Sequence, residues 1–392
     1  MAAQRVLFYV QHLLGIGHLK RAAALVDGMT CAGLNVTLVT GGVPVPGLEI
    51  NASHCVQLAP ASAADLSFKT LFDAHGQPVD AAWKDARRAQ LLEAWAVCAP
   101  DALVIELFPF GRRQMRFELL PLLDAATARP SRPLIVSSVR DLLGGGQSDP
   151  ARADQMLATF DRYFDHVLVH GDPALVSFER TFRHAARLAG RLHYTGYVVA
   201  GGTARSGRDP AALLPDSEVL VSVGGGAVGQ RLLEAALEAR PLSCLRDRPW
   251  RLLAGVNVAD ADLARLFALA AMQHGVVLER YRADFPSLLA QCRLSVSQGG
   301  YNTVMEILQA QAPSVVVPFA GGAEVEQSLR TRLLADKGWV QLVDEEALSG
   351  PALAKAIDQA AQRPAGLAPS LHLDGARVGA ALLAGWLSAR AA

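Results

Sequence analysis

Histidine and carboxylate side chains occur in this sequence at positions suited to acid–base chemistry. His18 follows two glycines in GIGHLKR, residues 15–21, and lies in the first turn of a predicted helix. The positive end of a helix dipole favours a neutral imidazole, the form that a general base requires. Glu106 lies at the end of an apolar run typical of a strand. We predict His18 and Glu106 as catalytic residues; a capping or core role explains the histidine equally well.

A second set of residues is suited to holding a phosphate. In SVSQGGYNTVMEIL, residues 295–308, an apolar strand runs into Gly299 and Gly300, and a helix follows. The free N–H groups of a helix N-terminus attract anions. Glu306 lies about two turns beyond Gly299, on roughly the same face of the helix. We therefore expect a phosphate at the glycines and a hydroxyl-rich group at Glu306, with a solvated or capping glutamate as the alternative.

Another glycine-rich corner lies in SVGGGAVGQ, residues 222–230. Gly224, Gly226 and Gly229 match Gly-x-Gly-x-x-Gly, a spacing found in dinucleotide sites. The tip of the next predicted strand lacks the acid that such sites place on a ribose. We therefore favour a corner that admits a phosphate, and keep NAD as the weaker interpretation.

A last corner lies in VPFAGGAEVEQSLRTRLL, residues 317–334, where a buried strand gives way to a glycine loop. Glu324, Glu326 and Gln327 then open a helix. Acidic residues are common at the start of a helix, because they interact favourably with the helix dipole. Their functional interpretation is a set of acceptors for sugar hydroxyls.

The elements that position these residues are short apolar runs alternating with helix-length segments. This alternation predicts an α/β fold with two doubly wound, Rossmann-like domains that face a cleft, where ligands bind beyond the carboxyl ends of the strands. The predicted strands are 5–10, 35–40, 102–107, 133–139, 166–171 and 192–198, then 218–223, 250–255, 275–280, 293–298 and 313–319. The predicted parts are a first domain at 1–199, a linker at 200–217, a second domain at 218–367 and a final helix at 368–392.

Strand tips in the first domain supply further candidates. Arg140, Asp141 and Asp172 each follow an apolar run, so we expect them at the acceptor side of the cleft, with caps and local ion pairs as the alternative. A nearby segment combines aromatic and basic residues that suit an anionic lipid surface, although an ordinary buried edge is the favoured interpretation. Its residues are Phe108, Phe110, Arg112, Arg113, Arg116 and Phe117.

Composition excludes several classes of function. The formal net charge is zero and the aromatic fraction is 6%, so neither a basic groove nor a stacking platform for nucleic acid is expected. No apolar run reaches the roughly 18–20 residues of a membrane span. The five cysteines are scattered without metal-ligand spacing, and we expect buried thiols, no metal site and a cytoplasmic location.

Taken together, these motifs resemble a known family. SQGGYNTVMEIL followed by PSVVVPF and EVEQSLRTRLLADKG is similar to the donor-binding half of GT-B glycosyltransferases, in particular the MurG-type branch, family 28. GIGHLKRAAAL resembles the N-terminal glycine loop of that branch. The glycine loop at 224–230 departs from the branch, because Gln230 is displaced. The middle of the first domain, about 45–165, matches nothing in the family.

The resemblance implies a role for each matching residue. His18 serves as base or substrate positioner, and Glu306 binds the ribose. The segment at Arg280 and Tyr281 meets the nucleotide base, and Glu326 and Gln327 lie near the donor sugar. The implied diphosphate site comprises Gly17, Gly224, Gly225, Gly226, Ser297, Gly299, Gly300, Asn302 and Thr303.

We hypothesise an inverting, metal-independent glycosyltransferase that moves a hexose, with N-acetylglucosamine favoured, from a UDP-sugar to an unidentified acceptor. The UDP-sugar is a co-substrate, and no other cofactor is expected. Peripheral contact with the inner face of the membrane fits this branch. The alternatives are a nucleotide-sugar hydrolase or 2-epimerase on the same fold, or a non-catalytic sugar-nucleotide-binding subunit.

Overall fold

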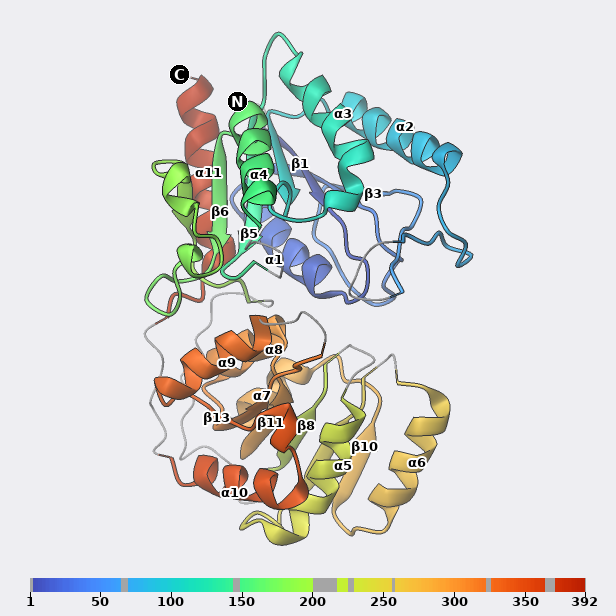
Figure 1. Ribbon diagram of the computed structural model, residues 1–392, viewed down its shortest axis with the longest axis vertical. Coiled ribbons are helices and arrows are strands. Elements are labelled where there is room, and N and C mark those ends of the chain that lie inside the picture. The colour runs from blue at the N-terminus through green and yellow to red at the C-terminus, as the bar shows by residue number, and fades with distance from the viewer. Residues whose placement is uncertain are drawn as a thin grey trace. The chain divides into compact units, whose positions relative to one another are not determined.

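The chain divides into two compact units in the computed structural model (Figure 1). The structure describes residues 3–64, 70–143, 149–199, 217–224, 229–255, 258–321, 326–363 and 371–391. The first unit comprises residues 1–202 and 371–392, and the second comprises residues 203–370. Most of the predicted linker, residues 200–216, lies outside the described residues.

The first unit is built on a seven-stranded parallel sheet with the order β3-β2-β1-β4-β5-β6-β7. Val, Ile and Leu dominate its central strands, which are buried on both faces as parallel sheets require. The strands are β1 (Arg5–Val10), β2 (Asn35–Thr40), β3 (His54–Gln57), β4 (Ala102–Glu106), β5 (Leu134–Arg140), β6 (His166–His170) and β7 (Leu192–Tyr194).

Helices cover both faces of this sheet (Figure 1). On one face, α1 (Gly17–Cys31) packs against α11 (Gly375–Ala391), so the end of the chain belongs to the first unit. On the other face lie α2 (Ala81–Cys98), α3 (Arg116–Thr127) and α4 (Pro150–Tyr163). Asp80 and Asp149 cap α2 and α4 by accepting hydrogen bonds from backbone N–H groups, which fixes where these helices begin. Short 3-10 helices lie at η1 (Arg113–Met115), η2 (Phe178–Arg180) and η3 (Ala185–Leu188).

The second unit holds a six-stranded parallel sheet with the order β10-β9-β8-β11-β12-β13. Its strands are β8 (Val219–Ser222), β9 (Trp250–Leu253), β10 (Val276–Glu279), β11 (Leu294–Gln298), β12 (Ser314–Val317) and β13 (Gln341–Leu342). Its helices are α5 (Gln230–Ala239), α6 (Asp260–Ala271), α7 (Phe285–Gln291), α8 (Tyr301–Ala310), α9 (Glu326–Asp336) and α10 (Gly350–Ala361), with 3-10 turns η5 (Arg240–Leu242) and η6 (Glu345–Ala347).

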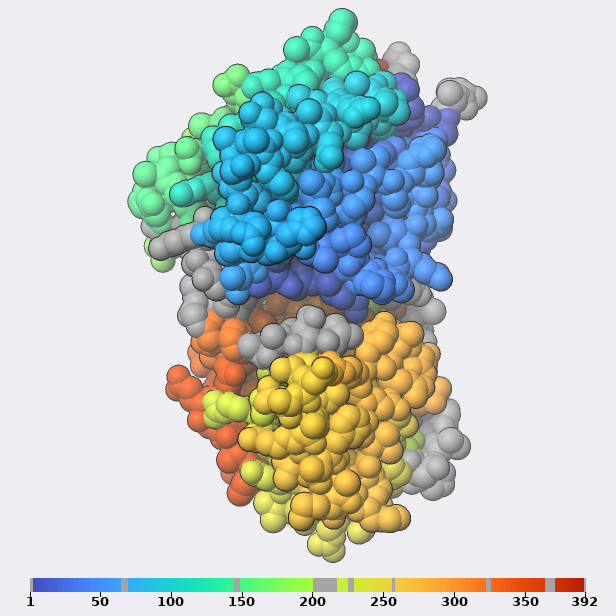
Figure 2. Space-filling model, turned by 90° about the vertical axis from the view of Figure 1, so that its right-hand side faces the viewer, coloured from blue at the N-terminus to red at the C-terminus, as the bar shows by residue number. Residues whose placement is uncertain are grey.

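Helices α5, α6 and α10 bury one face of this second sheet in a single apolar cluster. In Figure 2, the gold residues around α6 form part of the outer surface of this unit. Ala259 is the N-cap of α6, so the Asp-x-Asp at Asp260 and Asp262 lies in the first turn of the helix.

The predicted α/β fold with two doubly wound sheets is confirmed, and every predicted strand is present within a few residues. The edge strands β3 and β13 were not predicted, because HCVQ is short and largely exposed and QL has only two residues. The expectation of buried cysteines is wrong for Cys31, Cys55 and Cys244, which are exposed. No helix among the described residues is long and apolar enough to cross a bilayer.

Candidate functional site

His18 and Glu106 meet at the carboxyl edge of the first sheet. His18 lies in the first turn of α1, and Glu106 is the last residue of the neighbouring strand β4. The imidazole Nδ1 lies 2.6 Å from the Glu106 Oε1. Because an ionised carboxylate can only accept, the ring donates from Nδ1, which leaves Nε2 as the acceptor. This is the arrangement of a base that is oriented by an acid.

Glu106 is fully buried and receives further support from α1. The guanidinium of Arg21 donates to the same Oε1 atom. Although burial would raise the pKa of Glu106, its contacts with His18 and Arg21 hold that pKa well below its usual range. The carboxylate is therefore ionised at neutral pH, and its Oε2 accepts no hydrogen bond from the described residues.

The His18 ring is neutral at pH 7. Burial lowers its pKa from 6.5 to about 3, and the opposing effect of Glu106 is too small to restore it. Arg112 and Arg140 add to the lowering, because a protonated ring beside two cations is unfavourable. The side chain remains 16% exposed, so Nε2 is within reach of a substrate proton.

Cationic side chains act on this pair. Arg21, Arg112 and Arg140 all act electrostatically on the group formed by His18 and Glu106. Burial and Arg140 lower the pKa of Arg112, while Glu106 opposes them. The edge of the first sheet therefore offers a cationic environment that an anionic substrate would neutralise.

Two of the predicted acceptor-side residues make structural contacts. Asp141 accepts hydrogen bonds from the Leu142 N–H, at 2.9 Å, and from the Tyr197 hydroxyl, at 3.0 Å. Asp172 accepts from the His372 N–H at 3.0 Å, which ties the chain before α11 to the first unit. Both carboxylates are buried, and the hydrogen bonds from Tyr197 and His372 are neither the caps nor the local ion pairs of the alternative.

The interpretation of the segment after β4 as an apolar–basic surface is wrong for its first two aromatic residues. Phe108 and Phe110 are buried, and Phe110 packs edge-on against Phe178 and Phe182. Phe117 is partly buried against the core cluster of the same unit. The favoured alternative, a buried edge that carries arginines, describes these aromatic residues.

In the second unit, the two glycines between β11 and α8 differ in their surroundings. A Cβ added at Gly299 would lie 3.1 Å from Pro318 Cα and 3.1 Å from Thr331 Oγ1. A Cβ added at Gly300 would meet nothing within 4 Å. Gly299 is therefore tightly packed, whereas Gly300, the N-cap of α8, faces open space.

The two glycine corners of this unit adjoin each other. Strand β8 pairs with β11, and a Cβ added at Gly224 would lie 4.0 Å from Thr303 Oγ1, in the first turn of α8. Gly224 has a φ of +71°, a left-handed conformation that favours glycine. The predicted residues Gly225 and Gly226 lie outside the described residues.

Side chains on and before α8 divide into buried and half-buried groups. Ser297 is buried, and its hydroxyl bonds Ser295 at 2.9 Å, so it can face a ligand only through its backbone. Asn302, Thr303 and Glu306 are half-buried on the first two turns of α8.

The residues predicted near the donor sugar lie at the start of α9. Glu326 is buried, and its Oε1 lies 3.2 Å from the Arg330 guanidinium, which lies over the Tyr301 ring. Gln327 accepts a hydrogen bond from the Phe319 N–H at 3.2 Å. The Glu326 contact lies within α9, whereas the Gln327 contact joins α9 to the segment after β12.

The segment predicted to meet the nucleotide base follows β10. Arg280 donates to the Val258 carbonyl at 2.9 Å and pairs with Asp260, and its own carbonyl accepts from the Gly255 N–H. Tyr281 is 59% exposed, so its ring is accessible to a planar ligand.

The sequence interpretation missed the positioning role of Arg21. It lies three residues after His18, on the same face of α1, a spacing that could have indicated a shared partner.

Gly17 begins α1. The described residues contain no cluster of three or more His, Cys, Asp or Glu side chains that could hold a metal ion.

Comparison with known proteins finds a family match in the second unit. Residues 220–372 match the model of the glycosyltransferase family 28 C-terminal domain. A UDP-N-acetylglucosamine–N-acetylmuramyl-(pentapeptide) pyrophosphoryl-undecaprenol N-acetylglucosamine transferase from Synechococcus sp. strain CC9902 is 30% identical over 179 residues, which are 43% of this chain and 47% of that protein. The chain thus spans about half the length of the relatives it matches.

Solved structures share the fold over nearly the whole chain. The calicheamicin glycosyltransferase CalG4 has a TM-score of 0.60 at 17% identity, covering 99% of this chain and 96% of that one. MurG from Acinetobacter baumannii has a TM-score of 0.59 at 15% identity, covering 97% and 99%. A Listeria monocytogenes protein named provisionally as a UDP-N-acetylglucosamine 2-epimerase has a TM-score of 0.63 at 12% identity, covering 100% and 98%. The predicted GT-B fold and the resemblance to the family 28 branch are confirmed.

Proposed function

We propose that this chain, a GT-B protein whose second unit is a glycosyltransferase family 28 C-terminal domain, transfers a hexose from a UDP-sugar to an acceptor bound by the first unit. The observation that carries this proposal is the His18–Glu106 pair, because a neutral imidazole oriented by a buried carboxylate suits proton removal from an acceptor hydroxyl. The relatives' name favours UDP-N-acetylglucosamine as the donor.

The donor is held by the adjoining glycine corners of the second unit. The diphosphate lies against Gly300 and the start of α8, with the loop at Gly224 on its other side. Glu306 accepts hydrogen bonds from the ribose hydroxyls, and Tyr281 faces the base. As the bond to the sugar breaks, negative charge grows on the leaving phosphate, and the preorganised N–H groups stabilise it.

The acceptor reacts at the edge of the first sheet. His18 Nε2 takes the proton of the acceptor hydroxyl as that oxygen attacks the anomeric carbon, and Glu106 stabilises the imidazolium that forms. Attack opposite to the departing diphosphate inverts the anomeric centre. No metal ion takes part, since the N–H groups at the glycine corners meet the phosphate charge.

The positive charge around His18 supports an acceptor that carries a negative group. Arg21, Arg112 and Arg140 all act electrostatically on the His18–Glu106 pair. The relatives act on a pyrophosphoryl-undecaprenol compound, which is anionic and lipid-linked. An acceptor of this class would also bring the protein to a membrane surface.

Release of UDP from UDP-N-acetylglucosamine tests this proposal against its alternatives. A transferase releases UDP only when an acceptor is supplied, whereas a hydrolase releases it in water alone. A 2-epimerase converts the sugar at C2, and a non-catalytic subunit binds UDP without turnover. UDP release that depends on the acceptor and is lost in His18→Ala is expected; any of the other three patterns would refute a transferase.

A further inference from the structure

A second buried histidine, His170, lies near the His18–Glu106 pair and takes no part in the proposed chemistry. It is the last residue of β6 and is fully buried. Burial and the positive charge of Arg21 lower its pKa from 6.5 to about 3, while Glu106 acts in the opposite direction. The ring is therefore neutral at pH 7. A neutral imidazole carries one donor and one acceptor, and when buried it needs a partner for each.

Both ring nitrogens of His170 have hydroxyl partners. Nδ1 lies 2.9 Å from Thr195 Oγ1, and Nε2 lies 2.8 Å from Ser138 Oγ. The Thr195 hydroxyl donates its proton to the Gly196 carbonyl at 2.8 Å, because a carbonyl can only accept. Thr195 therefore accepts from the ring at Nδ1, which leaves Nε2 as the acceptor for the Ser138 hydroxyl. The hydrogen bonds from Ser138 to Gly196 thus run in one direction.

Ser138 lies beside Glu106. The two residues are register partners on the neighbouring strands β5 and β4, so their side chains extend from the same face of the sheet. Glu106 accepts on Oε1 from His18 and Arg21, whereas its Oε2 is buried and accepts no hydrogen bond from the described residues. A hydroxyl on the adjacent strand is a natural donor for such an oxygen. In this protein that hydroxyl donates to His170 instead.

The lack of a donor at Oε2 increases the effect of Glu106 on the base. Each hydrogen bond that a carboxylate accepts stabilises its negative charge, and this weakens its attraction for a neighbouring cation. A carboxylate without a donor at Oε2 therefore stabilises the imidazolium of His18 more strongly. In the proposed function, that imidazolium forms when His18 takes the proton of the acceptor hydroxyl.

We propose that His170 is a positioning residue that holds the Ser138 hydroxyl away from Glu106 and so keeps His18 basic. The importance of this contact for turnover rests on the proposed function, in which His18 is the general base. His170 acts through Ser138 and touches neither substrate. When the acceptor at Nε2 is removed, the Ser138 hydroxyl is released and donates to Glu106 Oε2.

Reaction of the full chain with diethyl pyrocarbonate tests this inference without an acceptor substrate. The reagent acylates the unprotonated nitrogen of an imidazole, so its rate at His18 reports the nucleophilicity of Nε2. Mass spectrometry of a digest measures this rate, with the exposed His75 as an internal reference. The variants are His170→Phe, Ser138→Ala and the double variant that carries both substitutions.

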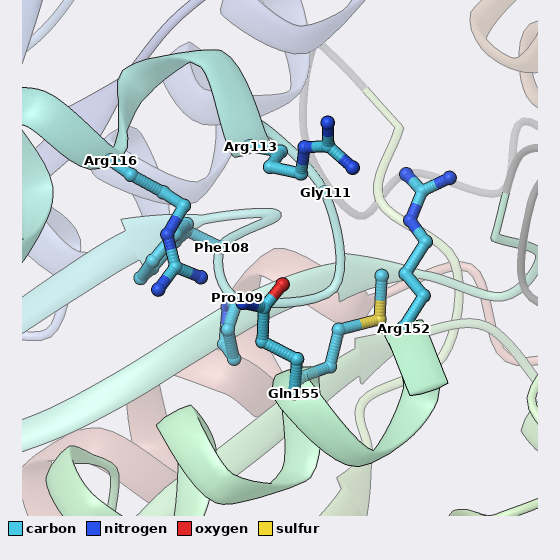
Figure 3. A pocket seen from close by; sticks show the side chains of 8 residues that line it. Phe108, Pro109, Gly111, Arg113, Arg116, Arg152 and Gln155 are labelled. Atoms are coloured by element: carbon cyan, nitrogen blue, oxygen red, sulfur yellow. The ribbon is translucent and has the colours of Figure 1, made fainter. Parts of the chain in front are cut away.

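A second variant and a matched control complete the set. Thr195→Val removes the partner of Nδ1 with little change of shape, so the His170 ring can donate from Nε2 and release the Ser138 proton. The control is Ser137→Ala. Ser137 is equally buried but lies on the opposite face of β5, where it donates to the Phe108 carbonyl at 2.8 Å. Figure 3 shows Phe108 in the segment after β4.

We expect His170→Phe and Thr195→Val to lower the rate at His18 by about two- to tenfold, the effect of one hydrogen bond. Ser138→Ala and Ser137→Ala should stay within about twofold of wild type. The double variant should recover the wild-type rate, since no hydroxyl is left to reach Glu106. A purely structural role for His170 predicts instead that the double variant reacts no faster than His170→Phe.

Three results would overturn the inference. They are a wild-type rate in both His170→Phe and Thr195→Val, a double variant no faster than His170→Phe, and no reaction at His18 in the wild-type protein. Acceptor-dependent UDP release, measured on the same variants, should change in parallel with the rate at His18. If wild type releases no UDP while the pattern of reaction rates holds, the proposed function fails and the role of His170 stands.

Discussion

Replacing His18 with alanine tests the proposed chemistry most sharply. The substitution removes the base and its hydrogen bond to Glu106, and it leaves the buried Arg21–Glu106 pair in place. Because His18 lies in the first turn of a 15-residue helix and alanine has a higher helix propensity, the fold should tolerate the change. A loss of activity can therefore be attributed to the missing imidazole.

The expected size of the effect follows from the role of a general base. Such a group contributes about 10²–10⁴-fold to the rate, or about 3–5 kcal/mol of transition-state stabilisation. The low pKa of His18, about 3, makes it a weak base in the free protein, so we expect a loss near the lower end, about 10²-fold in kcat. The donor KM should change little, because the predicted donor contacts lie in the second unit.

Initial-rate kinetics with saturating acceptor and varied UDP-N-acetylglucosamine separate the two parameters. His75→Ala is the matched control, since this histidine is exposed in a turn of the same unit. Turnover of His18→Ala within a few-fold of wild type would show that His18 is not the base. A large rise in donor KM with unchanged kcat would instead place His18 in donor binding.

Three further predictions concern pH and the second unit. Burial lowers the pKa of His18 to about 3, so the ring stays neutral as the pH falls from 8 to 5. We therefore expect kcat/KM to be constant from about pH 8 to pH 5. A fall in kcat/KM at acidic pH, centred near the usual histidine pKa, would contradict this. Gly299→Ala should lower the free energy of unfolding by about 1–3 kcal/mol, because its Cβ would crowd Pro318. Gly300→Ala should have the wild-type free energy of unfolding and should weaken UDP binding. If the two glycine substitutions changed the free energy of unfolding and the UDP affinity equally, the assigned roles would be wrong. Glu306→Ala should weaken UDP affinity by about tenfold or more with little change in kcat, so an unchanged UDP affinity would remove Glu306 from the ribose site.

Much of the fold could be predicted because the strands of buried parallel sheets are short apolar runs. RVLFYV and NVTLVT appear as β1 and β2 with the predicted bounds. Two of the four edge strands, β3 and β13, escaped prediction, because a strand that is paired on one side only needs less apolar sequence. In β3, three of the four residues of HCVQ are exposed.

The site was predictable only in part. Strand tips placed His18 and Glu106 at one edge of the sheet, but their 2.6 Å contact depends on the register of β1 and β4, which the sequence does not encode locally. Asp141 and Asp172 lie at similar tips, yet their carboxylates bond backbone and tyrosine groups from distant segments. Position at a strand end therefore predicted that these acids share one edge of the sheet, but it did not predict the partner of each carboxylate.

The central claim, that the second unit binds a UDP-sugar, is tested most directly by calorimetric titration of the full chain with UDP, dTDP, GDP and NAD in the absence of added metal. The account predicts micromolar binding of UDP that is weakened in Gly300→Ala and Glu306→Ala. Binding of NAD with none of UDP would contradict it and would assign the glycine corner at Gly224 to a dinucleotide.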